Sequence, residues 1–124
     1  MDHPYADLID LKLEPHQEEG QSTCSVVVHK RLFNTHRVVH GGVLYALADT
    51  GMGAAVYPSL KPDETCATIE IKINYFRPVT SGTIQCTSKV IHRGKRIANM
   101  ESCLYVDDQL VAKANGSYSI FEKS

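Results

Sequence analysis

Residues 39–57, VHGGVLYALADTGMGAAVY, constrain the fold of this chain more than any other stretch. Positions 42–57 contain no proline and a single charged side chain, Asp49, and their apolar residues lie around almost the whole circumference of a helix. A helix that is apolar on nearly all sides is a buried helix. At about 1.5 Å per residue it spans roughly 24 Å, which suits the centre of a small domain and is too short to cross a membrane. The stretch therefore predicts a helical core with one carboxylate inside it.

The length and charge of the chain exclude several classes of protein. A chain of 124 residues is large enough to bury its own core, so residues 1–124 are expected to form a single domain. Its 13 basic and 14 acidic residues give a formal net charge of −1. General nucleic-acid binders and membrane-surface binders carry an excess of basic residues, so neither kind of partner is expected. An anionic ligand has to be held by a local basic patch.

The cysteines and the N-terminal residues indicate a protein of the cytoplasm. The cysteines are widely separated, lack C-x-x-C spacing and each lie in a strand-like run, which predicts small, reduced core residues at Cys24, Cys66, Cys86 and Cys103. The N-terminal residues contain no basic leader followed by an apolar run, and no segment approaches about 18 apolar residues. We therefore expect a cytoplasmic protein with no membrane partner.

Outside the helix, the chain has the alternating pattern of β-strands. The predicted strands cover residues 8–13, 22–29, 65–76, 83–91, 97–106 and 110–121. A turn at residues 18–20 joins the first two strands into a hairpin. The polar loop 30–37 leads into the helix, and Pro58 with the turn 61–64 ends it because proline cannot continue a helical ladder.

Two of these strands indicate which face meets the helix. Strand 65–76 is predicted to be half buried, with Ile69, Ile71, Ile73 and Tyr75 on one face and Thr68, Glu70, Lys72 and Asn74 on the other. Strand 110–121 carries mostly small residues on a common face, namely Leu110, Ala112, Ala114 and Gly116. Small residues leave room for a helix to lie close against a sheet.

Five or six antiparallel strands and one apolar helix have few ways to bury that helix. The sheet has to curl around it, which predicts an α+β protein with one long central helix. A sheet of this kind still exposes its outer face and its edges, so self-association is expected.

Several short motifs resemble those of one enzyme family. Asn34, the sequence His40-Gly41-Gly42, Asp49 nine residues after the histidine, and NYFRPV at residues 74–79 resemble the hotdog-fold acyl-CoA thioesterases. The similarity is to the subfamily that includes the phenylacetate-pathway and human thioesterase-superfamily enzymes, and it covers residues 8–121. It implies the hotdog fold and hydrolysis of an acyl-CoA to free CoA and a carboxylic acid. No cofactor is implied, because coenzyme A is part of the substrate.

The two glycines at the start of the helix suit a developing negative charge. Unpaired N–H groups and the positive end of the helix dipole polarise a thioester carbonyl, although a glycine turn also serves close packing alone. The resemblance implies that the N–H of Gly41, helped by the Asn34 side chain, forms this oxyanion site. His40 is then a residue that shapes or supports the turn, and Gly42 is expected to contact the substrate.

Asp49 is the strongest candidate for catalysis. An aspartate has poor helix propensity and a buried carboxylate is costly, so its presence inside this helix needs a reason. One alternative is an aspartate that only bonds a neighbouring hydroxyl such as Thr50. The resemblance implies that Asp49 is a general base or a nucleophile. Related families have a glutamate one turn away, where this chain has Gly53 and other small residues, so the resemblance favours the aspartate type of site. Thr68 matches a hydroxyl that orients the water, or else it is a surface residue of its strand.

A basic hairpin tip offers a site for the phosphates of coenzyme A. The expected substrate-binding residues there are Arg93, Gly94, Lys95 and Arg96, although such a tip is equally compatible with simple solvation. Tyr45, Asp49 and Met52 share one helical stripe. Tyr45 and Met52, with Tyr57, either line an acyl tunnel or pack in the core.

Three other functions share parts of this pattern. A non-catalytic acyl-CoA binding or sensing module keeps the fold and lacks the chemistry. An acyl-thioester dehydratase needs a histidine base paired with the acid of the helix, and no histidine accompanies Asp49 along the helix. A metal site formed by His36, His40 and Asp49 needs a further ligand on the same face.

Helix geometry predicts a site shared between two chains. His40 and Asp49 lie about 13 Å apart along the helix axis and about 180° apart around it. One carbonyl does not reach both, so Asp49 of one chain is expected to complete the oxyanion site of another, as similar thioesterases do. This predicts a homodimer with two composite sites, assembled further as a dimer of dimers.

Overall fold

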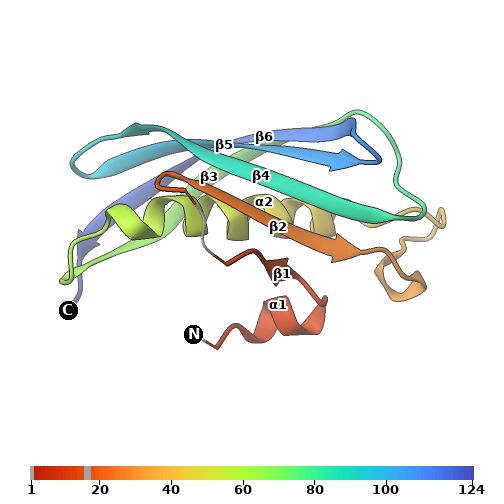
Figure 1. Cartoon of the computed structure of the whole chain (residues 1–124), viewed down its shortest axis with the longest axis horizontal. Coiled ribbons are helices and arrows are strands. Elements are labelled where there is room, and N and C mark those ends of the chain that lie inside the picture. The colour runs from red at the N-terminus through yellow and green to blue at the C-terminus, as the bar shows by residue number, and fades with distance from the viewer. Residues whose placement is uncertain (1, 16–17) are drawn as a thin grey trace.

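The long helix α2 (Gly41–Val56) lies against one face of a curled, six-stranded antiparallel sheet in the computed structural model, which describes residues 2–15 and 18–124 (Figure 1). The other elements are α1 (Pro4–Leu8), β1 (Lys12–Leu13), β2 (Gln21–Val27), the 3-10 turns η1 (Lys30–Leu32) and η2 (Tyr57–Ser59), β3 (Glu64–Tyr75), β4 (Thr83–Arg93), β5 (Ile97–Val106) and β6 (Gln109–Glu122). The strand order is β1-β2-β4-β5-β6-β3. This is the predicted α+β hotdog fold.

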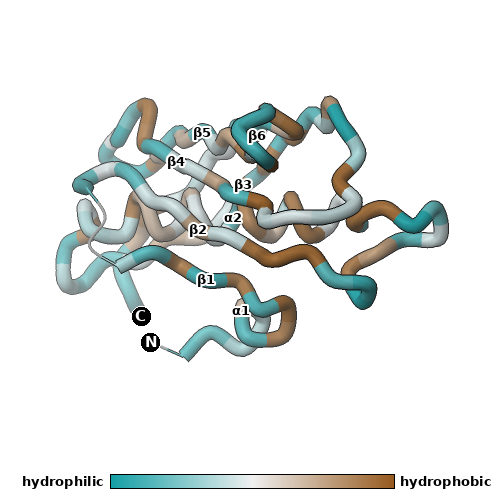
Figure 2. Tube along the Cα trace, turned by 45° about the vertical axis from the view of Figure 1, so that its right-hand side comes forward, coloured by the Kyte–Doolittle hydropathy of each residue, from teal (hydrophilic) through white to brown (hydrophobic). Residues whose placement is uncertain are grey.

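The core lies between α2 and the sheet, as the apolar circumference of the helix predicts. Leu47, Ala48, Met52 and Val56 are each fully buried. The small residues of β6 allow the close contact: a Cβ added at Gly116 would lie 2.6 Å from Met52 Sδ. Figure 2 shows apolar stretches in β2 and at the end of α1 on the same side of the molecule.

The N-terminal segment differs from the prediction of a strand over residues 8–13. Residues Pro4–Leu8 form a short helix that begins with a proline. His3 caps this helix, because its Nδ1 accepts a 3.2 Å hydrogen bond from the N–H of Ala6. Only Lys12–Leu13 is extended. The predicted hairpin pairing is confirmed, because β1 pairs antiparallel with β2. Part of its connection lies outside the described residues.

The prediction of a half-buried strand at 65–76 is also wrong in one respect. A β-bulge lies between Thr68 and Glu70, so the residue between them, Ile69, has no partner on β6 and is 54% exposed. A bulge adds one residue to one strand and shifts the alternation beyond it. Thr68 therefore shares the helix-facing side with Ile71 and Ile73, and not the opposite side.

Strand β6 shows a second irregularity that the alternation did not predict. The register shifts between Leu104 and Tyr105 of β5, so Val111 is buried at 3% exposure and Leu110 is 36% exposed. Leu110 is therefore not part of the small-residue face, whereas Ala112 and Ala114 are.

The cysteines are all free and all lie on strands, as predicted. Cys24 and Cys86 are buried core residues, but Cys66 and Cys103 are only partly buried. In the described part of the chain, no helix is both long enough and apolar enough to cross a membrane.

Candidate active site

Asp49 lies in the third turn of α2 and is held from the sheet by two hydroxyl groups. Thr68 Oγ1 donates a 2.8 Å hydrogen bond to Asp49 Oδ1. The Tyr118 hydroxyl donates to the same Oδ1 and lies 2.6 Å from the main-chain oxygen of Asp49. The Oδ2 atom accepts no hydrogen bond from residues 2–15 or 18–124. One carboxylate oxygen is therefore fixed and the other is open.

Tyr118 is a site residue that the sequence analysis did not identify. It lies on β6, two residues beyond Gly116, and is 3% exposed. The alternation of Ala112, Ala114 and Gly116 toward the helix extends to Tyr118 and is the signal that predicts its direction. Burial, followed by the hydrogen bond to Asp49, raises the pKa of Tyr118 well above its ordinary value of about 10. The phenol therefore remains a hydrogen-bond donor at neutral pH.

The bulge in β3 is what brings Thr68 to Asp49. Thr68 pairs with Tyr118 and Glu70 pairs with Ser117, while Ile69 between them has no partner in the described residues of β6. Because paired residues on adjacent strands point to the same face, the two hydroxyl groups lie side by side. Thr68 thus contacts the candidate carboxylate directly and is not merely a surface residue of its strand.

A mostly apolar cavity of about 630 Å³ opens at Asp49. Its walls come from the N-terminal segment, α2, η2 and β3, and include Tyr5, Leu13, Ala46, Gly53, Ala54 and Tyr57. The sequence is compatible with two roles for Tyr45, Met52 and Tyr57, namely lining an acyl tunnel or packing in the core. Tyr57 lines this cavity, whereas Met52 is fully buried in the core. Tyr45 is 36% exposed and lies outside the lining of this cavity.

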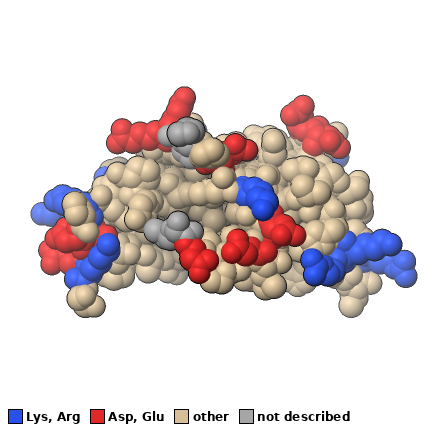
Figure 3. Space-filling model, turned by 60° about the horizontal axis from the view of Figure 1, so that its bottom comes forward, with Lys and Arg blue, Asp and Glu red and all other residues tan. Residues whose placement is uncertain are grey.

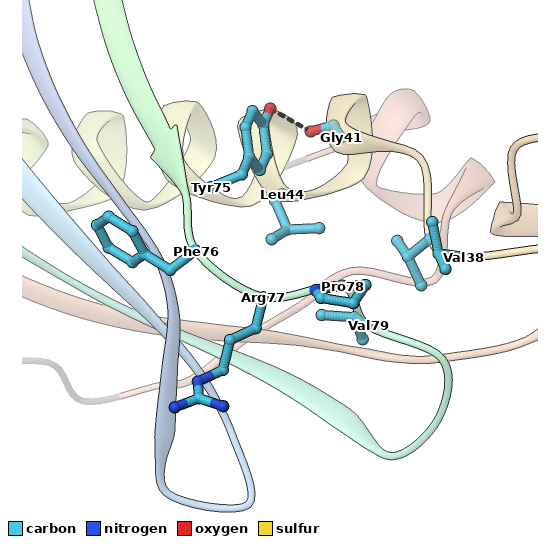
Figure 4. Close-up of a pocket in the computed structure, with 9 residues that line it drawn as sticks. Val38, Gly41, Leu44, Tyr75, Phe76, Arg77, Pro78 and Val79 are labelled. Atoms are coloured by element: carbon cyan, nitrogen blue, oxygen red, sulfur yellow. Dashed lines mark hydrogen bonds between the residues drawn. The ribbon is translucent and has the colours of Figure 1, made fainter. Parts of the chain in front are cut away.

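The N-terminal end of α2 forms a different environment. Gly41 lines a separate cavity of about 300 Å³ together with Leu44 and Tyr75. Figure 4 shows the Tyr75 hydroxyl bonded to the main-chain oxygen of Gly41, at 2.7 Å, with Arg77 pointing away from the helix. Within the described chain no group accepts the N–H of Gly41, as expected for the first amide of a helix.

His40 and Asn34 shape the approach to this helix end. His40 is the N-cap residue of α2, and its Nδ1 accepts a 2.8 Å bond from the N–H of Gly42. That bond is the supporting role expected of His40, and it occupies the amide of Gly42. Asn34 Oδ1 accepts bonds from the N–H groups of His36 and Val38, at 2.9 and 3.4 Å. The carbonyl side of this amide thus holds the loop, and its Nδ2 remains available as a donor.

The basic hairpin tip between β4 and β5 contains one engaged and two exposed cations. The Arg93 guanidinium bonds Ser59 Oγ at 3.0 Å, the Ser59 carbonyl at 3.1 Å and Glu64 Oε1 at 3.2 Å. Arg93 therefore ties the tip to η2 and to the start of β3. Lys95 and Arg96 are exposed. Gly94 closes the hairpin, because a Cβ there would lie 2.6 Å from the Ile97 carbonyl.

The charges of the surface are unevenly distributed. On the face shown in Figure 3, most basic side chains gather toward the two ends of the molecule, and the middle carries mainly acidic and uncharged side chains with an isolated basic group among them. Among residues 2–15 and 18–124, no three His, Cys, Asp or Glu side chains gather closely enough to hold a metal ion. His36 and His40 thus lie apart from the carboxylate of Asp49.

The chain is similar to known proteins in sequence and in fold. It is 31% identical over 80 residues to the acyl-coenzyme A thioesterase PaaI of Escherichia coli, covering 64% of this chain and 55% of PaaI. It superimposes on the conserved protein PA5202 of Pseudomonas aeruginosa with a TM-score of 0.91 and 33% identity, covering 98% of this chain and 96% of that one. Thioesterase HI1161 of Haemophilus influenzae shares the fold, with a TM-score of 0.89 and 23% identity over 95% of this chain and 82% of that one.

The sequence pattern of a protein family matches the part of the chain that contains α2, β3, β4, β5 and the start of β6. The match runs from residue 36 to residue 113, which is more than half of the chain, and includes the candidate carboxylate and the glycines of the helix start. This chain therefore belongs to the thioesterase superfamily.

Proposed function

We propose that this protein hydrolyses acyl-CoA thioesters to free coenzyme A and a carboxylic acid. The observation that supports this most strongly is the Asp49 carboxylate, which has Oδ1 bound by Thr68 and Tyr118 and Oδ2 open beside a cavity of about 630 Å³. The printed name of the Escherichia coli relative specifies acyl-coenzyme A, and we assign the same class of substrate here.

In the proposed reaction Asp49 acts on a water molecule. Asp49 Oδ2 accepts a proton from the water as its oxygen attacks the thioester carbon. The carbon–sulfur bond then breaks, coenzyme A leaves as a thiolate, and the proton passes from Asp49 to the sulfur or to solvent. Thr68 and Tyr118 keep the carboxylate oriented, because both hydroxyl groups donate to Oδ1 and fix its position. No metal or added cofactor takes part.

The N–H of Gly41 is proposed to polarise the thioester carbonyl, assisted by Asn34 Nδ2. An unpaired amide at a helix N-terminus is suited to an oxyanion, and the dipole of α2 adds to its effect. Gly41 lies eight residues before Asp49, about 12 Å along the helix axis, and the cavities beside the two residues share no lining residue. We therefore assign the two groups of one site to different subunits.

The free edge of the sheet supports this dimer. Strand β3 is 12 residues long and pairs only with β6, so its other edge presents unpaired backbone groups within the described chain. If two β3 edges pair antiparallel about a two-fold axis, the two α2 helices also run antiparallel. This arrangement allows the N-terminal end of each helix to lie near the middle of the other, as a composite site requires.

Lys95 and Arg96 are proposed to hold the phosphates of coenzyme A. Both are exposed at the hairpin tip, whereas Arg93 is already paired with Glu64 and serves to hold the tip in place. Gly94 shapes the tip. Near the N-terminal end of α2, Gly42 and Tyr45 lie on the first two turns of the helix, within reach of a thioester bound at Gly41.

Turnover of a panel of acyl-CoAs, measured as release of free thiol, tests the proposal. The panel should contain aryl and straight-chain acyl groups and one acyl thioester that lacks the nucleotide. We expect hydrolysis without added metal, with a higher KM for the truncated thioester. Tight binding with no release of thiol would instead identify a binding module. Formation of an enoyl thioester from a hydroxyacyl-CoA would identify a dehydratase.

A further inference from the structure

We propose that buried serines of the sheet, and Ser22 above all, are positioning residues that set the depth and rotation of α2 so that Asp49 meets Thr68 and Tyr118. This inference deepens the proposed function and rests on Asp49 being the reactive carboxylate. None of the three serines described below lines the cavity at Asp49; they act through the backbone of the helix.

Three serines on neighbouring strands form a polar row beneath the helix. Ser22 of β2, Ser88 of β4 and Ser102 of β5 are 1%, 2% and 0% exposed. Ser22 Oγ donates a 2.6 Å bond to the main-chain oxygen of Gly51, and Ser102 Oγ donates a 3.4 Å bond to that of Ala48. Ser88 and Ser102 bond each other at 2.6 Å.

Other side chains of the sheet extend this contact around one turn of α2. The thiols of Cys24 and Cys86 lie 3.5 and 3.6 Å from the oxygen of Leu47, and the Tyr118 hydroxyl reaches the oxygen of Asp49. Three carbonyl oxygens near the carboxylate, those of Leu47, Ala48 and Gly51, therefore accept a donor from the sheet, and that of Asp49 lies against the Tyr118 hydroxyl. A carbonyl has two lone pairs, so each accepts this second bond in addition to its helical bond.

The helix needs such directional contacts because the rest of its surface is apolar. Apolar contacts are non-directional and allow a helix to slide or rotate, whereas hydrogen bonds have preferred distances and angles. A carboxylate lies about 6 Å from its helix axis, so a rotation of about 10° moves it by about 1 Å. Displacements of this size lower the rate of a reaction that depends on aligned groups.

Gly51 shows how closely the helix is held at this row. A Cβ added at Gly51 would collide with Ser88 Oγ and would lie 3.5 Å from Ser22 Oγ. The absence of a side chain at Gly51 allows its carbonyl to reach Ser22. The serine row and Gly51 therefore form one fitted contact, located in the turn that also carries Asp49.

Steady-state kinetics of Ser22→Ala, Ser22→Cys and Ser25→Ala test the inference. Ser25 lies on the same strand with its side chain on the opposite face, so Ser25→Ala is the matched control. We expect Ser22→Ala to lower kcat about 10-fold with KM within about twofold of the wild type. Ser22→Cys keeps a donor and should recover much of the loss. Ser102→Ala removes the longer 3.4 Å bond to the Ala48 carbonyl and should therefore lower kcat by a smaller factor.

A second readout does not depend on turnover. The hydroxyl proton of Tyr118, identified in NMR spectra by its absence in Tyr118→Phe, reports the contact with Asp49. It should shift or exchange faster in Ser22→Ala and match the wild type in Ser25→Ala. If Ser22→Ala lowers only the melting temperature and leaves both kcat and this proton unchanged, the serines are merely structural and the inference is wrong. A loss of kcat that Ser22→Cys does not relieve would also contradict it.

The same measurement separates this inference from the proposed function. If the wild-type protein hydrolyses no acyl-CoA, the proposed function fails, and the Tyr118 proton alone decides the positioning. A shift in Ser22→Ala but not in Ser25→Ala would then support the serine contact, and its absence would overturn it.

Discussion

The two groups proposed for catalysis both lie on α2, but different kinds of contact hold them in place. At the N-terminal end, Gly41 and Gly42 are arranged by their own neighbours in sequence, with His40 as the cap. In the third turn, Asp49 is held by Thr68 and Tyr118, which lie 19 and 69 residues away along the chain. The first arrangement forms with the helix itself, whereas the second exists only when the sheet has closed over the helix.

This difference indicates how each region should respond to substitution. Backbone amides at a helix N-terminus remain in place after most side-chain changes. A carboxylate held by distant hydroxyls depends on the position of each strand that supplies one. Changes around Asp49 should therefore have larger effects on activity than changes of similar size near Gly41.

The largest effect is expected from Asp49→Asn. Asparagine keeps the shape and can still accept bonds from Thr68 and Tyr118, but it does not take a proton from water. We expect kcat to fall by about 10²-fold or more with the fold retained. Asp108→Asn is the matched control, because Asp108 lies in an exposed turn at φ 63°, a conformation that asparagine tolerates. Hydrolysis by Asp49→Asn near the wild-type rate would refute the proposed role of Asp49.

A smaller loss is expected from Tyr118→Phe, which tests the distant support of Asp49. The phenyl ring keeps the packing of Tyr118 and removes the donor to Asp49 Oδ1 and to its main-chain oxygen. We expect kcat to fall about 10-fold with KM little changed. Thr68→Val removes the other donor and should act in the same direction. Unchanged kcat in both variants would show that Asp49 does not need these hydroxyls.

A still smaller effect is expected from Tyr75→Phe at the other end of the helix. This change removes the 2.7 Å bond to the main-chain oxygen of Gly41 but leaves the N–H of Gly41 in place. We expect kcat to fall by about threefold or less. If Tyr75→Phe lowered kcat more than Tyr118→Phe, the contrast between the two regions would be reversed.

The last effect leaves activity at neutral pH unchanged and concerns stability at high pH. The pKa of Tyr118 is raised in the folded protein, mainly by burial, so above about pH 10 the unfolded chain loses this proton and the folded chain keeps it. Stability should therefore fall as pH rises beyond about 10, by up to about 1.4 kcal/mol per pH unit from this group. Tyr118→Phe lacks the group and should show a shallower decline in denaturant titrations at pH 9 to 11. Parallel declines would show that Tyr118 ionises normally in the folded state.

The same contrast explains which parts of the molecule the sequence predicts. The helix follows from a local pattern, the apolar run, and the place where it begins follows from the H-G-G motif, whose histidine is its N-cap. Tyr118 was missed, although its place two residues beyond Gly116 on a regular strand indicates its direction. The bulge at Ile69 has no marker such as glycine or proline, and it exists only in the pairing of β3 with β6.

Two other differences also have a physical cause outside the local pattern. The short helix Pro4–Leu8 depends on His3 as its cap, and histidine is not among the residues that usually indicate a helix start. Arg93 looks like part of a phosphate site because sequence shows only its basic neighbours. In the structure Ser59 and Glu64 take its guanidinium, and both are about 30 residues away along the chain.

The most direct test of this account concerns the shared site. The test combines two inactive chains: Asp49→Asn, and Gly41→Pro, which removes the polarising N–H. Proline is accepted at the first position of a helix. Gly41→Ala is the matched control for Gly41→Pro, because it adds the same Cβ, 3.0 Å from the Tyr75 ring, and keeps the N–H.

The two inactive chains are unfolded and refolded together in equal amounts, and the acyl-CoA hydrolase activity of the mixture is measured. Random pairing makes about half of the dimers mixed, and each mixed dimer has one intact site of two. We predict that activity returns to about a quarter of the wild-type value. No recovery from folded, verified mixed dimers would show that each chain builds its own site, and would contradict the account.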